Sequence, residues 1–149
     1  MAYEKQYCTF KLDDLYFGVE VLNVQEVFKY QEMTEVPLSS PVVRGLINLR
    51  GQIITAIDLR KRLDMDPLPE GRMPMNVVVR TKEGVVSLLV DEIGDVLEVS
   101  PDDYEDTPDT VEGLMRELVL GVYKLEGKLL LILDTEKAVH VESKQIESK

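Results

Sequence analysis

One stretch of this sequence occurs twice, and the repetition constrains the fold more than any other feature. Residues 43–63 read VRGLINLRGQIITAIDLRKRL, and residues 119–139 read VLGVYKLEGKLLLILDTEKAV. Because a repeat adopts the same local structure in each copy, it predicts two similar halves. Aligned 76 residues apart, the copies have these positions in common: Val43 with Val119, Gly45 with Gly121, Leu49 with Leu125, Gly51 with Gly127, Asp58 with Asp134, and Lys61 with Lys137.

Each copy predicts a β-hairpin followed by a short helical turn. Gly51 tolerates a positive φ, so the chain can reverse at residues 49–52. The flanking segments, 46–49 and 53–57, are rich in apolar and β-branched residues, which is typical of strands. Asp58 ends the second strand and is placed to cap a helical turn over 59–63 through its side-chain oxygen.

A second pair of matched segments precedes the hairpins, at a separation of 69 residues. Since the separation then grows to 76 residues, the second half holds additional residues within the acidic segment 100–118. The aligned pairs are Val21 with Val90, Val24 with Ile93, Glu26 with Asp95, and Val27 with Val96.

The remaining patterns predict an all-β chain built from two small barrels. Residues 6–22 indicate a hairpin with its turn at Asp13–Asp14, and residues 76–90 indicate another. Segment 64–74, DMDPLPEGRMP, has the composition of a linker. We therefore expect subdomains over about 6–66 and 75–139, each with five short strands, followed by a polar tail over 140–149. Barrels of this size have small cores, so we expect the two to pack together and neither to be stable alone.

Composition excludes several classes of partner. The net charge of −11 over 149 residues argues against binding to nucleic acid or to an anionic membrane surface. Apolar runs fall short of the roughly 18 residues that a membrane span needs, and the N-terminal residues lack the pattern of a signal peptide. The single cysteine, Cys8, cannot form an internal disulfide, which favours a reducing cytoplasm.

The sequence predicts no catalytic, cofactor or metal site. The only histidine, His140, lies near the C-terminus, away from the apolar strands. The acidic cluster Asp102, Asp103, Glu105 and Asp106 lacks the glycine and terminal glutamate of a calcium-binding loop. Zinc ligands and a phosphate-binding loop are also missing from the sequence. We therefore predict that the protein is not an enzyme.

Three features point to protein binding. Arg50 occupies a hairpin turn that favours Asn or Asp, and its counterpart Glu126 has the opposite charge. An exposed guanidinium there is suited to a partner's carboxylates or carbonyls. The run from Val21 to Val27 indicates a bent strand with one apolar side. Two packed barrels also leave a groove between them, and such grooves are frequent binding sites.

These residues resemble the CheW family of chemotaxis coupling proteins. The resemblance covers about residues 6–139 and rests on FGVEVLNVQEVF, VVVRTKEGVVSLLVDEIGDVL and the repeat at 43–63. Its most specific part is the motif Gly45, Asn48, Leu49, Arg50 and Gly51, followed by a strand that ends at Asp58. The resemblance implies a single CheW-like domain over 6–149, with two packed, intertwined five-stranded SH3-like β-barrels and short helical turns. The N-terminal strand and the C-terminal segment would cross between the barrels.

The resemblance also implies a non-enzymatic, cytoplasmic adaptor without cofactors. Such proteins join the cytoplasmic tips of methyl-accepting chemoreceptors to the regulatory domain of the histidine kinase CheA, within membrane-associated signalling arrays. They do not insert into the membrane. By motif match, the kinase-binding residues are Cys8, Val21 and Val24. The receptor-binding residues are Glu26, Asn48, Arg50, Val90, Ile93 and Val96. Segment 102–118 and the polar tail depart from the family pattern.

Three alternative interpretations remain at this level. The first is a scaffold of the same fold in another chemosensory pathway, such as surface motility. The second is a generic SH3-like peptide-binding module, although this class depends on clustered aromatic residues, and the chain has no Trp and only scattered Tyr and Phe. The third is a small hydrolase that uses the acidic cluster, which predicts stability that depends on a metal ion.

Overall fold

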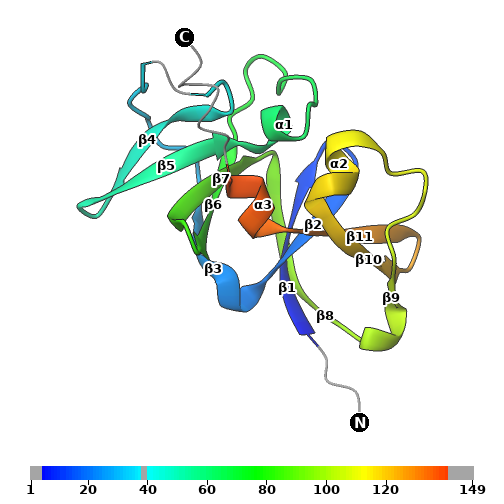
Figure 1. Ribbon diagram of the computed structural model, residues 1–149. Helices are drawn as coiled ribbons and strands as arrows, with labels where there is room; N and C mark the ends of the chain where they lie inside the picture. The colour runs from blue at the N-terminus through cyan, green and yellow to red at the C-terminus, as the bar shows by residue number, and fades with distance from the viewer. Residues whose placement is uncertain (1–4, 38–39, 141–149) are drawn as a thin grey trace.

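The structure is a computed structural model that describes residues 5–37 and 40–140, and it consists of two β-sheets with short helices (Figure 1). One sheet has five strands in the order β3-β6-β7-β5-β4, and the other has six in the order β8-β1-β2-β11-β10-β9. The five-stranded sheet contains β3 (Val24–Phe28), β4 (Val43–Leu49), β5 (Gln52–Asp58), β6 (Met75–Thr81) and β7 (Gly84–Val90). The six-stranded sheet contains β1 (Lys5–Leu12), β2 (Leu15–Glu20), β8 (Glu92–Val99), β9 (Tyr104–Glu105), β10 (Val119–Leu125) and β11 (Lys128–Leu133).

The predicted repeat is confirmed in detail. The β4–β5 and β10–β11 hairpins each contain a register shift, between Val43 and Gly45 in one and between Val119 and Gly121 in the other. Each hairpin leads into a short helix, α1 (Leu59–Arg62) or α3 (Thr135–Val139). The side chain of Asp58 accepts a hydrogen bond from the backbone N–H of Lys61, and Asp134 accepts one from that of Lys137. These two aspartates therefore serve the architecture as helix caps.

The two sheets exchange hairpins between the halves of the sequence. β1 and β2 lie in the sheet that holds β8, β10 and β11, whereas β6 and β7 lie with β3, β4 and β5. Each exchanged hairpin joins its sheet through a parallel pair, β2 with β11 and β7 with β5. The expected bounds 6–66 and 75–139 therefore do not coincide with the division into sheets, and both strands of the N-terminal hairpin cross.

The strand count differs from the five expected for each half. Segment 100–118 forms η2 (Pro101–Asp103), the short strand β9 and α2 (Gly113–Leu118), and β9 adds a sixth strand beside β10. At the matching place in the other sheet, Thr34 forms an isolated bridge with Leu46. Gly45 and Gly121 lie beside these crossing segments, where a Cβ atom would collide with Thr34 or Tyr104. The repeated glycine therefore admits a crossing segment in each sheet.

The connection between β2 and β3 also differs from the prediction. A strand was expected to run from Leu15 to Leu22, but β2 ends at Glu20 and residues Val21–Asn23 form the 3₁₀ turn η1. The chain has to leave one sheet at this point and enter the other, and the turn redirects it. The polar tail predicted over 140–149 lies outside the described residues except for His140, which follows α3.

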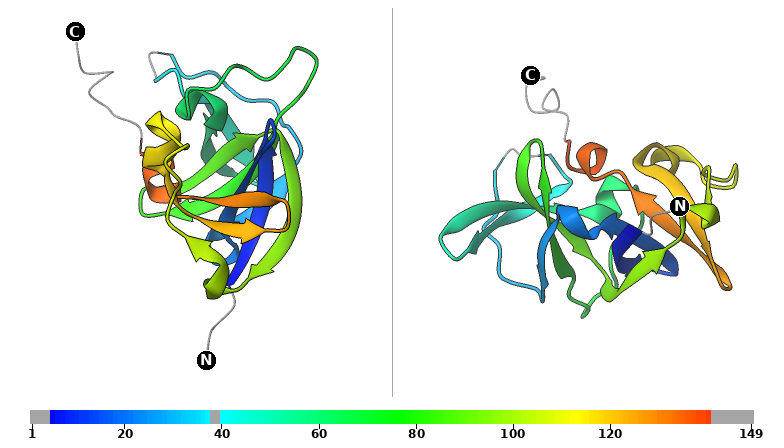
Figure 2. Two further views of the ribbon diagram at one scale, coloured as in Figure 1. Left: turned by 90° about the vertical axis from the view of Figure 1, so that its right-hand side faces the viewer. Right: turned by 90° about the horizontal axis from the view of Figure 1, so that it is seen from below.

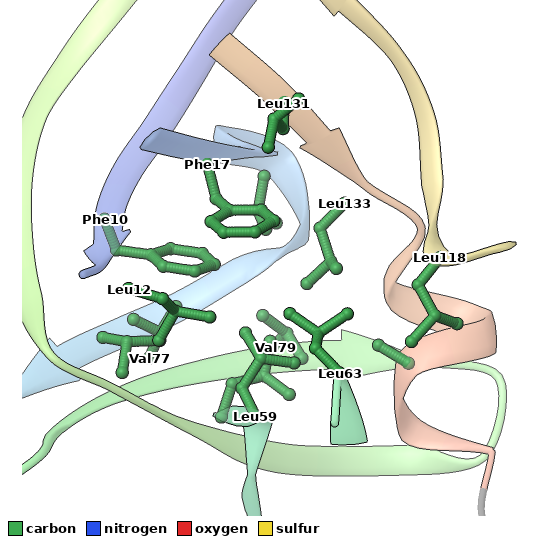
Figure 3. Packing of buried hydrophobic residues seen from close by; sticks show 14 of the residues in the cluster. Phe10, Leu12, Phe17, Leu59, Leu63, Val77, Val79, Leu118, Leu131 and Leu133 are labelled. Atoms are coloured by element: carbon green, nitrogen blue, oxygen red, sulfur yellow. The ribbon is translucent and has the colours of Figure 1, made fainter. Parts of the chain in front are cut away.

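The largest hydrophobic core is shared by both sheets. Figure 3 shows Phe10, Leu12 and Phe17 of one sheet facing Val77 and Val79 of the other, with residues of α1 and α2 closing the same space. The burial of one such aromatic or aliphatic side chain stabilises the folded state by about 1.5–3 kcal/mol. Much of the stability therefore depends on contact between the sheets. The hairpins β4–β5 and β10–β11 project on opposite sides of this core (Figures 1 and 2).

Candidate protein-binding surface

The turn of the β4–β5 hairpin holds Arg50 in a backbone conformation that arginine rarely adopts. Arg50 has φ 52° and Gly51 has φ 89°, and two successive positive φ values are the signature of a type I′ hairpin turn. The side chain of Asn48 accepts a hydrogen bond from the backbone N–H of Gly51 at 2.9 Å and supports the turn. Asn48 thus has a structural role, whereas Arg50 is a costly choice for its position.

Arg50 forms an ion pair with Glu26, which lies on β3. The two side chains are 71% and 26% exposed, so this pair is open to solvent and contributes little to stability. β3 and β4 stand at opposite ends of the strand order, so the pair joins the two edges of the five-stranded sheet. We call Glu26, Asn48, Arg50 and Ile53 the hairpin-tip surface.

Ile53 is a member of this surface that the sequence did not single out. It lies opposite Asn48 in the β4–β5 ladder and is 59% exposed. Its neighbour Ile54 is buried, as expected from the alternation of side chains in a strand. That alternation was the available signal, since it leaves one of the two isoleucines facing solvent.

The corresponding place in the six-stranded sheet carries different chemistry. Glu126 replaces Arg50 and Asp95 replaces Glu26, so the attractive pair becomes two carboxylates. Among the described residues, the non-glycine positions with positive φ are Asp13, Arg50 and Asp64, so Glu126 does not share the conformation of Arg50. The hairpin-tip surface is therefore found on one sheet only.

The residues predicted to bind the receptor do not all lie on one surface. Val90 is buried, with 1% of its surface exposed, and belongs to the shared core, so the prediction that its side chain contacts a partner is wrong. Val90 lies on β7, the central strand of the five-stranded sheet, where residues 86–90 are all buried. The alignment with half-buried Val21 did not reveal this burial. Ile93 packs partly against the core, and Val96 is 55% exposed; both lie on β8, in the other sheet from Arg50.

The residues predicted to bind the kinase lie around η1 and β1. Cys8 is half-buried on β1, directly across from Val96 on β8, and burial raises the pKa of its thiol. Val21 is half-buried in η1, and Val24 on β3 packs partly against the shared core. Part of Val24 therefore supports the fold.

Leu22 is the apolar residue that η1 presents most fully to solvent, with 86% of its surface exposed. Leu120, on β10, is 59% exposed, and together with Glu20 and Asn23 it lines a hollow of about 160 Å³ next to η1. We call Val21, Leu22 and Leu120 the η1 surface. Sequence reasoning missed Leu22 because it expected a strand through this position, and missed Leu120 because its repeat partner is Arg44.

The His, Cys, Asp and Glu side chains of the described residues do not gather into a metal-binding cluster. Over 5–37 and 40–140, no three His, Cys, Asp or Glu side chains converge on a point where a metal ion would fit. His140 lies 2.6 Å from a carboxylate oxygen of Glu83, and both side chains are about half exposed. None of the helices in the described part of the chain has the length and apolar character to cross a membrane.

Comparisons with known proteins agree with this architecture. The family model described as a CheW-like domain matches residues 6–143. The chain is 32% identical over 136 residues to the chemotaxis protein CheW of Thermotoga maritima, covering 91% of this chain and 88% of that protein. It is 29% identical over 141 residues to CheW of Rhizobium meliloti, covering 95% and 91%. The crystal structure of the scaffolding protein TtCheW from Thermoanaerobacter tengcongensis superposes with a TM-score of 0.85 at 26% identity, covering 96% of this chain and 97% of that one.

Proposed function

The chain belongs to the CheW-like family, and on this basis we propose that it is a non-enzymatic chemotaxis adaptor that joins methyl-accepting receptors to the histidine kinase CheA. Its place would be the cytoplasm, at receptor arrays on the membrane. The relatives carry the names chemotaxis protein and scaffolding protein, which support the role of a scaffold. The choice of receptor and kinase as the two partners is the proposal.

One observation carries the receptor part of the proposal. The hairpin-tip surface differs from its counterpart in the repeat at Arg50, which has a positive φ that arginine rarely adopts. The turn itself therefore gains nothing from an arginine at this position. The fold needs a turn at this point but has no need of a cation there, as the hairpin with Glu126 demonstrates. Arg50 and Glu26 would set the register of a receptor helix through charged contacts, and Ile53 would add apolar area.

The β8 residues have a separate place in the proposal. Ile93 and Val96 remain candidates for receptor contact, because both lie on β8 and Val96 is exposed. Val90 is removed from the set because it is buried. The revised receptor-binding set is Glu26, Asn48, Arg50, Ile53, Ile93 and Val96.

We assign kinase binding to the η1 surface. This surface lies where the chain passes between the two sheets. Its exposed Leu22 offers apolar area to the regulatory domain of the kinase. Exposed apolar patches with polar rims mark protein-binding sites, and Glu20 and Glu136 supply such a rim beside Leu120. Leu22 is the anchor of this surface, with Val21, Val24 and Cys8 as supporting residues.

The mechanism follows from rigid placement of two surfaces. The shared core fixes the sheets relative to each other, so a receptor on one surface and a kinase on the other are held at a set distance and angle. An adaptor transmits a signal only if its contacts differ between the active and inactive arrangements. A receptor that shifts the Arg50 contact would therefore change the population of the active kinase.

Binding measurements with the two proposed partners test this function. The full chain would be titrated with a receptor tip fragment, with the kinase regulatory domain, and with each in the presence of the other. We expect both to bind and a ternary complex to form. Leu22→Asp should weaken regulatory-domain binding at least tenfold and leave receptor binding unchanged. Failure of either partner to bind, or competition between them for one surface, would contradict the proposal and favour another pathway or module.

A further inference from the structure

A cavity of about 330 Å³ lies away from both surfaces, between α1, β4 and the segment that follows α1. That segment, 64–74, arches over α1 at the top of Figure 1. The cavity has an apolar wall that includes Leu68, Pro69 and Met73, and Met73 is 57% exposed. Its volume is at the lower end of the range for ligand pockets, roughly 300–1,000 Å³.

A buried arginine builds the floor of this cavity. Arg60 donates to Asp91 through Nε at 2.8 Å and through Nη2 at 2.6 Å, and it also pairs with Asp13. Its Nη1 donates to the backbone carbonyl of Asp66 at 2.7 Å, which fixes the start of segment 64–74 over the cavity. Burial acts to raise the pKa of Asp91, but the hydrogen bonds and charge of Arg60 and the backbone N–H of Asp13 outweigh it and hold this pKa below its usual value. The floor is thus a satisfied ion network, and the cavity above it is preformed.

Three exposed or loosely paired cations, Arg44, Lys61 and Arg72, line the mouth of the cavity. The side chains of Arg44 and Lys61 are exposed and form no ion pair within the described residues. Arg72 has only a long contact of 3.6 Å with exposed Glu92. Asp58 and Glu70 also line the cavity, but Asp58 is engaged in capping α1. Two cations without an ion pair in the described part of the chain, and a third that is only loosely paired, thus come together from three separate segments although the chain has a net charge of −11.

The repeat shows that the scaffold does not require the cation at position 44, since the counterpart of Arg44 is Leu120. The hollow beside η1 is the counterpart of this cavity, since it is lined by Leu120, Asp134 and Glu136 where the cavity has Arg44, Asp58 and Arg60. Only the capping aspartate is the same in both. The counterpart of Asp91 is Leu22. One fold therefore carries a basic, loop-covered cavity in one place and an acidic-rimmed apolar hollow in the other.

We propose that this cavity binds an extended acidic peptide segment of a partner protein. Carboxylates of the peptide pair with Arg44, Lys61 and Arg72, and an apolar side chain between them packs against Leu68, Pro69 and Met73. A lone inorganic anion would use one cation and leave the apolar wall bare, whereas a peptide with alternating acidic and apolar residues uses both. The proposal does not depend on receptor or kinase binding, since the hairpin-tip and η1 residues do not line this cavity.

Fluorescence anisotropy with a labelled peptide of alternating glutamate and leucine tests the proposal on the full chain. We expect Arg44→Gln and Lys61→Gln each to weaken binding about threefold, and the double variant about tenfold. Lys29→Gln with Lys82→Gln is the matched control, because it removes the same charge from exposed sites outside the cavity. The control should bind as the unaltered chain does, and circular dichroism should show that all the variants are folded.

Three results would overturn the proposal. Equal weakening by the control would show that net charge alone attracts the peptide. Equal binding of a glutamine–leucine peptide would show that carboxylates are not recognised. Absence of binding to the unaltered chain at low salt would show that the cavity has no such ligand. Chemical shift changes at Arg44 and Gly71 upon addition of peptide would, in contrast, place the ligand directly in the cavity.

Discussion

The two hairpin repeats, β4–β5–α1 and β10–β11–α3, have the same backbone plan and opposite chemistry at key positions. Both have the register shift at the repeated glycine and the capping aspartate at the end of the second strand. The turns differ, with Arg50 in one and Glu126 in the other. The helices that follow the two hairpins differ as well, since α1 has Arg60 at the position where α3 has Glu136. The glycine and the aspartate that recur build the fold, whereas Arg50 and Glu126, which differ, are exposed at the turns.

The helix positions illustrate this difference most clearly. Arg60 is buried, with 6% of its side chain exposed, and links α1 to the β1–β2 turn and to Asp91. Glu136 is exposed and, among the described residues, accepts hydrogen bonds from the backbone N–H of Lys82, in the β6–β7 turn. The same geometric contact between a helix and an exchanged hairpin is thus a buried ion network on one side and a surface hydrogen bond on the other.

The largest effect should come from separating the halves. We expect a fragment of residues 1–66 to lack cooperative unfolding, because β1 and β2 need β8 and β11 while β3 and β5 need β6 and β7. Circular dichroism melting and the dispersion of amide NMR signals would measure this. Mixing the fragment with residues 67–149 should restore the native spectrum. A cooperative transition of 1–66 alone would show that the halves are independent, contrary to the exchanged arrangement.

The next largest effect should distinguish Arg60 from Glu136. Arg60→Ala leaves Asp91 buried without its partner, so we expect a loss of about 3–5 kcal/mol in the free energy of unfolding, measured with urea. Glu136→Ala removes an exposed hydrogen bond and should cost less than about 0.5 kcal/mol. Similar losses in both variants would mean that the two contacts are energetically alike.

The dependence of stability on pH provides a check on the same network. The pKa of Asp91 is lower in the folded state than in the unfolded state, so the ionised carboxylate stabilises the fold. This stabilisation is fully present above the ordinary aspartate pKa of about 3.9 and is lost as the pH falls through the lower folded-state pKa. The difference in unfolding free energy between the unaltered chain and Asp91→Asn should therefore be constant near neutral pH and shrink below about pH 4. A difference that grows on acidification would contradict this sign.

The hairpins and their helix caps could be predicted from the sequence, because they depend on interactions between residues close together in the chain. Gly51, Asp58 and their counterparts act through turn and cap chemistry within a few residues, so the pattern was sufficient. The exchange of hairpins was only partly predictable, because parallel pairing of β2 with β11 joins segments more than a hundred residues apart. Val90 was misjudged for the same reason, since its burial depends on a second sheet that sequence periodicity does not reveal.

A moderate effect should separate the two repeated glycines. An added Cβ at Gly45 would lie 2.8 Å from the backbone oxygen of Thr34, so Gly45→Ala has to move backbone and should cost about 2 kcal/mol. Gly121→Ala meets the tip of the Tyr104 side chain, which can rotate away. It should cost about 1 kcal/mol, through the lost hydrogen bond from Tyr104 to the Leu120 carbonyl.

Denaturant unfolding of both alanine variants would measure these costs. In a Tyr104→Ala background the additional cost of Gly121→Ala should vanish, whereas that of Gly45→Ala should be unchanged. A Gly121→Ala cost that persists in this background would mean that backbone, and not the tyrosine, sets the constraint.

The smallest effect concerns the turns themselves. Arg50 has a positive φ, so Arg50→Gly should raise the free energy of unfolding by about 0.5 kcal/mol when measured in a Glu26→Gln background that removes the ion pair. Glu126→Gly, at a position without positive φ, should lower it by a similar amount. Destabilisation by Arg50→Gly would show that the arginine serves the turn after all.

The most direct test compares Arg50→Glu with Glu126→Arg in binding to a receptor tip fragment. Each reverses one charge in a matching hairpin turn, and Arg50→Gln controls for repulsion between the new glutamate and Glu26. We predict that Arg50→Glu weakens binding at least tenfold, that Arg50→Gln weakens it to a smaller extent, and that Glu126→Arg changes it less than twofold. Equal effects of the two reversals, or unchanged affinity in Arg50→Glu, would contradict the assignment of receptor binding to the hairpin-tip surface.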